Sequence, residues 1–342
     1  MKPVPARRHT SLALIVLSAV VVLAGACGGN KEATPQGAAP QRVIVGIQPG
    51  VFVTPYFIAD DEGYFEKNGI QVQQELFQDG AGVQEALIGG HIDVGYLGAS
   101  PAIVGAAHDP NIVIVAIDDL SNGGEGIVVR NDAGIETPAD LRGKKIGVAF
   151  GSTTHRFLYE VLGKAGLDPR KDVKLYDMEV ADQIAALQTG DIDAVANWEP
   201  WKSRAVAAGG HVLVDDSTAE VRTYDVIAAR KDWAEAHPDA LQAFLKAHFQ
   251  GAELKASNPE RAAELVAQHL DLKPAEILTT FAMFAHPTLA QEMSPEFFGQ
   301  PDVKARADIG FDVRFLHEQG LIDSEPDLNT LVVTDYLAAL HE

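Results

Sequence analysis

Two short segments place hydroxyl groups where helices are expected to begin. The segment Gly98 to Pro101 predicts Ser100 as an N-cap with Pro101 at the first helical position, and Gly151 to His155 sets Ser152, Thr153 and Thr154 in a row. Free N–H groups and the positive end of a helix dipole bind anions without Lys or Arg. Either segment alone is better explained as an ordinary cap. Because both follow expected strands, where α/β sheets bind ligands, the pair favours an anion site.

Two carboxylates stand in apolar or glycine-rich surroundings. Glu125 lies in SNGGEGIVV and Asp225 in TYDVIAA, each at the start of an expected strand. A buried carboxylate without a partner is costly, so a ligand ammonium would suit both, although a backbone group or Arg222 would serve as well. Trp198 is either a core residue or an aromatic wall against an alkyl chain or a cation. Together with the anion site, the two acids describe a small zwitterion.

Motifs for catalysis do not accompany these residues. The patterns G-x-S-x-G, H-E-x-x-H and G-x-x-x-x-G-K-[ST] are absent, and the 11 His do not cluster at metal-ligand spacing. We therefore expect a binding protein and not an enzyme, with no cofactor and no metal.

The elements that must position these residues alternate along the chain. Strands are expected at 42–48, 71–77, 92–98 and 111–119, then at 126–130, 141–151, 173–178, 192–198 and 224–230, with helices between most of them, including one over 152–164. This order predicts an α/β fold with mostly parallel sheets flanked by helices. The pattern A-L-x-x-G-x-I-D occurs at Ala86 and again at Ala186, which indicates either two similar lobes or a common helix-to-strand turn.

The helices expected after Arg230 are long enough to return to the first lobe. The chain would then cross between lobes near 120–126 and near 221–228, and two crossovers form a hinge. We assign 42–122 and 227–342 to lobe 1 and 123–226 to lobe 2.

Composition narrows the class of protein further. The chain has 342 residues and a formal charge of −21 from 48 acids and 27 bases, and it lacks a long run of Lys or Arg, so nucleic acid is not an expected partner. A single cysteine excludes an internal disulfide and a multi-Cys metal site.

That cysteine ends an export signal. Lys2, Arg7 and Arg8 precede an apolar run over 12–26, which is short for a spanning helix, and small residues lead into Cys27. The order Leu23 to Cys27 resembles a bacterial lipobox and predicts a lipoprotein signal peptide over 1–26 with lipidation of Cys27. The alternative is ordinary signal cleavage and an incidental thiol. Residues 27–41 predict a flexible tether near a membrane surface.

From Arg42 to about Leu337 the chain resembles the extracytoplasmic substrate-binding proteins of ATP-binding cassette importers, in the branch for taurine, alkanesulfonates and nitrate. The matching segments are Leu97 to Pro101, GSTTH at 151–155, Gly190 to Asp193 with Trp198 and Pro200, Arg230 to Asp232 with His237-Pro238, and FLHEQG at 315–320. The resemblance implies a two-lobed clamshell of periplasmic-binding-protein type II that closes on its ligand and meets an importer permease with its cytoplasmic ATPase.

The resemblance also implies a site for taurine or a related sulfonate. Ser100, Ser152 and Thr153 with their helix ends would hold the sulfonate, Glu125 and Asp225 the amine, and Trp198 the chain. Thr154, His155 and Gln48 complete the expected ligand set, Gln48 as an amide donor.

Three residues depart from the family pattern. Asp79 and Gly82 stand where relatives commonly carry Ser, and Glu199 is an extra carboxylate. Nitrate, another alkanesulfonate or an aromatic carboxylate therefore remain alternative ligands, and a membrane-tethered ligand sensor remains an alternative to uptake. An enzyme of the same fold that uses a Cys-rich motif does not fit a chain whose one cysteine lies in the export signal.

Overall fold

The computed structural model describes residues 40–294 and 304–341. The predicted signal peptide, Cys27 and nearly all of the predicted tether lie outside the described residues. Within the described ranges no helix has both the length and the apolar character needed to cross a bilayer.

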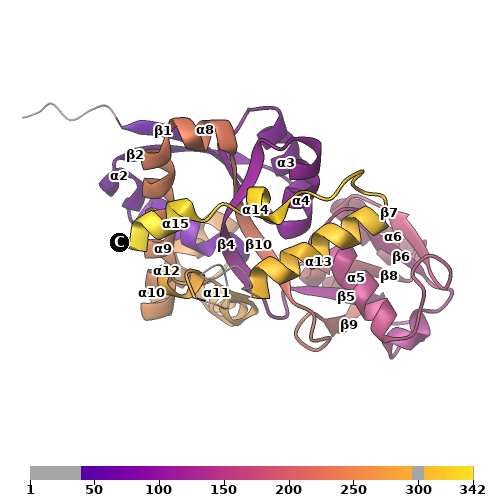
Figure 1. Ribbon diagram of the computed structural model, residues 1–342. Coiled ribbons are helices and arrows are strands. Elements are labelled where there is room, and N and C mark those ends of the chain that lie inside the picture. The colour runs from indigo at the N-terminus through magenta and orange to yellow at the C-terminus, as the bar shows by residue number, and fades with distance from the viewer. Residues whose placement is uncertain (1–39, 295–303, 342) are drawn as a thin grey trace, which may run out of the picture. The chain divides into compact units, whose positions relative to one another are not determined.

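The first sheet is six-stranded, with the order β11-β4-β10-β3-β1-β2. Strands β1, β2, β4 and β10 of this sheet are labelled in Figure 1. Strands β1 to β4 run in one direction and β10 and β11 in the other. The prediction of a mostly parallel sheet therefore holds except at β10, which is inserted between β3 and β4, and at β11, which pairs antiparallel with β4. The strands are β1 (Gln41–Ile47), β2 (Ile70–Leu76), β3 (Val94–Gly98), β4 (Ile112–Ser121), β10 (Thr223–Arg230) and β11 (Phe284–Ala285).

The second sheet is five-stranded, with the order β7-β6-β8-β5-β9. Its strands are β5 (Glu125–Arg130), β6 (Lys145–Val148), β7 (Lys174–Asp177), β8 (Ala194–Trp198) and β9 (Gly210–Asp215). Its helices are α5 (Thr153–Lys164), α6 (Val180–Thr189) and α7 (Trp201–Ala207), with a 3-10 turn at Pro138–Leu141. Strand β9 and helix α7 were not predicted. The run GHVLVD that forms β9 is short and only partly buried.

The remaining helices pack with the first sheet. They are α1 (Thr54–Asp61), α2 (Tyr64–Lys67), α3 (Gly80–Ile88), α4 (Ala99–His108), α8 (Lys231–Ala236), α9 (Pro238–Ser257), α10 (Pro259–Leu270), α11 (Pro274–Thr280), α12 (Leu289–Glu292), α13 (Lys304–Glu318), α14 (Leu328–Leu331) and α15 (Asp335–His341), with 3-10 turns at Val51–Val53 and Phe281–Met283. Their apolar side chains form one core with β1, β3, β4 and β10.

The two sheets share one topology, which confirms the prediction of two similar lobes. The order β4-β10-β3-β1-β2 in the first sheet corresponds to β9-β5-β8-β6-β7 in the second. The Asp of each A-L-x-x-G-x-I-D segment makes an equivalent hydrogen bond in its own lobe. Asp93 Oδ2 accepts from Ile44 N and Asp193 Oδ2 accepts from Lys145 N, both at 2.9 Å. The repeat therefore fastens an equivalent strand, β1 or β6, in each lobe.

The chain crosses between the sheets twice, at Asn122–Gly124 and again between Asp215 and Thr223. Because all of β10 pairs within the first sheet, the predicted lobe boundary at residue 226 falls inside a strand and belongs before Thr223. The sequence pattern could not locate this boundary, because β10 is an apolar run that would look the same in either sheet.

Candidate functional site

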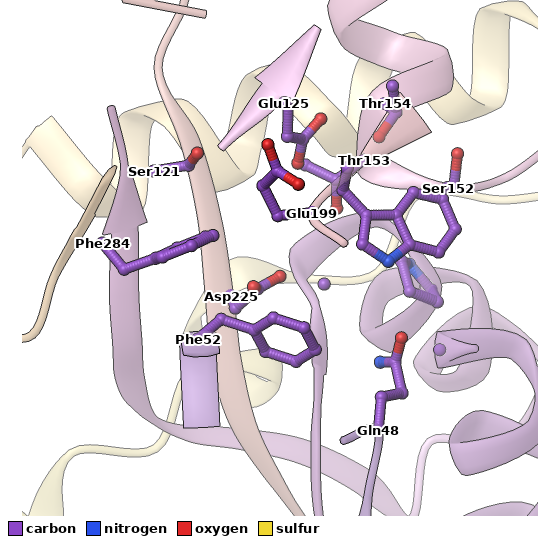
Figure 2. Close-up of a pocket in the computed structure, with 14 residues that line it drawn as sticks. Gln48, Phe52, Ser121, Glu125, Ser152, Thr153, Thr154, Glu199, Asp225 and Phe284 are labelled. Carbon is purple, nitrogen blue, oxygen red and sulfur yellow. The ribbon is translucent and has the colours of Figure 1, made fainter. Parts of the chain in front are cut away.

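A cavity lies where strands of both sheets end (Figure 2). Its walls come from the ends of β1, β3, β4 and β8, the starts of β5 and β10, and the first turn of α5. The cavity has a volume of about 50 Å³, which suits a small ligand. The lining residues are Gln48, Phe52, Gly80, Gly98, Pro101, Ser121, Glu125, Ser152, Thr153, Thr154, Trp198, Glu199, Asp225 and Phe284.

The first turn of α5 forms the hydroxyl-rich wall. Ser152 is the N-cap, and its Oγ accepts from His155 N at 3.1 Å and donates to the Ala149 carbonyl at 2.7 Å. The hydroxyl of Ser152 is thus already engaged, whereas Thr153 Oγ1 is buried with no hydrogen-bond partner among the described residues. The first N–H groups of a helix also lack intrahelical partners. This wall can donate hydrogen bonds to an anion.

Close approach of the two lobes at this wall depends on Gly98, the last residue of β3. A Cβ placed on Gly98 would lie 2.3 Å from Thr153 Oγ1, far inside contact distance. Any larger residue would push Thr153 away from the cavity.

Two carboxyl groups, those of Glu125 and Asp225, also line the cavity (Figure 2). Glu125 begins β5 and pairs in register with Trp198 on β8, and Asp225 lies near the start of β10. Burial raises the pKa of Glu125 well above its ordinary value, and Asp216 and Asp225 add to the rise, while the Thr154 hydroxyl opposes it. Burial raises the pKa of Asp225 to about 6, and a hydrogen bond between Asp225 and Asp119 limits the rise. Both groups would be stabilised as carboxylates by a cation in the cavity.

Glu199, the unexpected third acid, is neutralised within the protein. Its Oε1 lies 3.2 Å from Lys202 Nζ, and both side chains are buried. Its Oε2 accepts from Ser203 N at 3.2 Å, and Lys202 also donates to the Gly123 carbonyl in the first crossover. Glu199 therefore leaves less unmet negative charge in the cavity than its sequence position suggests.

Asp79 and Gly82, the other two departures, serve the fold locally. Asp79 caps α3, because its Oδ1 accepts from Gly82 N at 2.9 Å. Neither residue lines the cavity.

All of the predicted ligand residues except Ser100 and His155 line the cavity. Helix α4 begins at Ala99, so Gly98 holds the cap position and Ser100 lies within the first turn, contrary to the predicted N-cap. His155 is stacked on Phe150 with ring centroids 4.5 Å apart and meets Phe315 edge-on, which directs it away from the cavity. Burial lowers the pKa of His155 to about 4.

Sequence reasoning did not find the apolar wall made by Phe52 and Phe284 or the hydroxyl of Ser121. Ser121 had a usable signal, since it follows an expected strand. Phe284 had none, because it comes from the C-terminal helical region, far along the chain from the other lining residues.

Residues 36–270 match the NMT1-like family. The chain belongs to the NMT1-like family. It is 34% identical over 224 residues to the taurine-binding periplasmic protein of Escherichia coli K12, covering 64% of this chain and 69% of the relative. It is 31% identical over 264 residues to a putative aliphatic sulfonates-binding protein of Bacillus subtilis 168, covering 76% and 78%.

The fold of this NMT1-like chain is also that of a solved binding protein. The periplasmic aliphatic sulphonate binding protein SsuA from Escherichia coli superposes with a TM-score of 0.71 at 25% identity, over 86% of this chain and 92% of that one. The α/β clamshell with two sheets, predicted from sequence, is thereby confirmed.

Proposed function

We propose that the chain is the substrate-binding protein of an ATP-binding cassette importer and that its ligand is taurine or a closely related amino-sulfonate. The observation that supports this most directly is the charge pattern of the cavity, which combines a helix N-terminus and the unpartnered Thr153 hydroxyl with two buried acids, Glu125 and Asp225. No Lys or Arg is among the lining residues that the structure describes. The binding proteins to which the chain is similar support a binding role in place of catalysis.

This pattern argues against a plain anion as the best ligand. Nitrate or ethanesulfonate would gain the hydroxyl wall but would leave Glu125 and Asp225 without a cation, and a second negative charge nearby raises the cost. A molecule that carries both an anionic group and an ammonium group would bind the hydroxyl wall and the two acids at the same time. The aromatic rings of Phe52, Phe284 and Trp198 suit the short alkyl chain between them.

Ligand capture would close the two lobes about the crossovers at Asn122–Gly124 and 216–222. A ligand held by groups from both lobes binds the closed form better and so shifts the population toward it. The closed form would be the one recognised by the permease, whose cytoplasmic ATPase drives uptake.

The protein would work outside the cytoplasm, held to the membrane by a lipid on Cys27. Support comes from the export signal over 1–26 and from relatives named as periplasmic. Growth of a bacterial host with a radiolabelled fatty acid tests the anchor. We expect label on the wild-type chain and none on Cys27→Ser, and equal labelling of the two would reject the lipoprotein assignment.

Calorimetric titration of the purified chain with taurine and with ethanesulfonate tests the ligand. Ethanesulfonate keeps the anion and removes the amine. We expect taurine to bind at least tenfold more tightly, the smallest gain expected from one hydrogen bond to a charged group. Equal affinities would show that Glu125 and Asp225 do not hold the amine of taurine. A protein that binds neither compound would reject the amino-sulfonate assignment.

A further inference from the structure

A second carboxyl lies directly behind Asp225 and does not line the cavity. Asp119 on β4 is the register partner of Asp225 on β10. It is 0% exposed, and neither of its oxygens has a hydrogen-bond donor among the described residues. A fully buried carboxylate in that condition is costly, so something must neutralise it.

The groups that face Asp119 come from several elements. On β4 itself there is Asp118, on β10 Asp225, on β5 Glu125, on α9 Lys255, and after β11 His286. Carboxyl groups dominate this set, and they raise the pKa of Asp119 further once burial has raised it.

Lys255, the lysine among these groups, is committed elsewhere. Lys255 Nζ donates to the carbonyls of Phe284 and Phe281 and contacts His286 Nδ1 at 2.7 Å. The other nitrogen of that ring, Nε2, lies 2.6 Å from the Phe52 carbonyl, so it carries the hydrogen. Both ring nitrogens of His286 are therefore engaged, which leaves neither Lys255 nor a His-bound metal ion to neutralise Asp119.

A proton on one of the two carboxyl groups removes the repulsion between Asp119 and Asp225. Two carboxylate oxygens repel each other, whereas a carboxylic acid donates a hydrogen bond to a carboxylate. Asp225 borders the cavity, where a ligand cation stabilises its charged form, and Asp119 has no such opening. The hydrogen bond between them lowers the pKa of Asp225, as expected when Asp119 is the donor.

We propose that Asp119 keeps its proton and donates it to the Asp225 carboxylate, which makes Asp119 the positioning residue for the ligand's ammonium group. One oxygen of Asp225 is then held from behind and the other is directed into the cavity. The ligand-positioning part of this inference rests on the proposed amine role of Asp225.

Two substitutions in the full chain separate a proton donor from a second anion. Asp119→Asn keeps the shape and an N–H donor but cannot ionise, and Asp119→Leu removes the donor. We expect Asp119→Asn to bind taurine within about threefold of wild type. We expect Asp119→Leu to lose about 10- to 100-fold for taurine and to keep ethanesulfonate within about threefold. Equal taurine losses in both variants would mean that Asp119 acts as a carboxylate and would overturn the proposal.

Infrared spectroscopy reads the proton without any ligand. The difference spectrum of wild type minus Asp119→Asn at about pH 7.5 should contain the C=O band of a protonated carboxylic acid, and an absent band would overturn the proposal even if Asp119→Leu does not fold. Wild-type protein that binds neither taurine nor ethanesulfonate would reject the proposed function, while the infrared band would still decide where the proton lies.

Discussion

The Asp225→Asn variant tests whether Asp225 holds the ammonium group of the ligand. The substitution preserves the size of the side chain and its acceptor for Asp119, and removes the negative charge that faces the cavity. A hydrogen bond between charged groups contributes about 1.5–3 kcal/mol, so taurine affinity should fall about 10- to 150-fold. Ethanesulfonate has no ammonium, so its affinity should stay the same or rise.

The pH dependence of taurine affinity is a second quantity that the pKa of Asp225 predicts. With a pKa of about 6, Asp225 is ionised above pH 7 and becomes protonated as the pH falls through 6. At pH 5 about one tenth of it is ionised, so taurine should bind about tenfold more weakly than at pH 7.5. The neutral amide in Asp225→Asn should remove most of this dependence.

Isothermal titration at pH 5, 6 and 7.5 measures both effects, and Glu199→Gln is the matched control. Glu199 lines the same cavity but is paired with Lys202, so its amidation should leave the ratio of taurine to ethanesulfonate affinity within about threefold of wild type. Asp225 has no part in holding the amine if Asp225→Asn weakens both ligands equally, or if Glu199→Gln changes the ratio as much as Asp225→Asn does.

Three further substitutions test the other parts of the structure. Thr153→Val removes an unpartnered hydroxyl from the hydroxyl wall, so the affinities for taurine and ethanesulfonate measured by calorimetry should both fall about tenfold. A loss confined to taurine would contradict the role of this wall in binding the anion. Burial raises the pKa of Glu292 to about 8. Between about pH 5 and 8 the folded state therefore binds a proton that the unfolded state lacks. The free energy of unfolding should fall as the pH rises through that window, by at most about 1.4 kcal/mol per pH unit. Glu292→Gln keeps an acceptor for Ile117 N and should flatten that part of the profile in urea denaturation; parallel profiles for the two proteins would contradict the raised pKa. Arg156→Leu leaves Asp312, 2.7 Å away and equally buried, without its cation, and should cost about 3–5 kcal/mol of unfolding free energy; a loss under about 1 kcal/mol would show that Asp312 finds another partner.

The sequence by itself determined the features that depend on neighbours along the chain. The alternation of strands and helices, the C-terminal helices of the first lobe and the repeated A-L-x-x-G-x-I-D segment were all predictable, because amphipathic period and capping are local. The hydroxyl wall was predictable for the same reason, since Ser152, Thr153 and Thr154 lie in one turn of α5. The predicted cap at Ser100 was wrong, because Gly98 and Ser100 are both suitable caps and packing chooses between them.

Only the tertiary structure decided which of these residues meet. Pairing of β10 with β4 sets Asp119 behind Asp225, and a strand's register with a distant partner is not encoded in its own pattern. Phe284 reached the cavity from a region whose pattern gave no reason to look there. Local sequence determines what each side chain can donate or accept, whereas long-range pairing and burial decide which charges remain for a ligand.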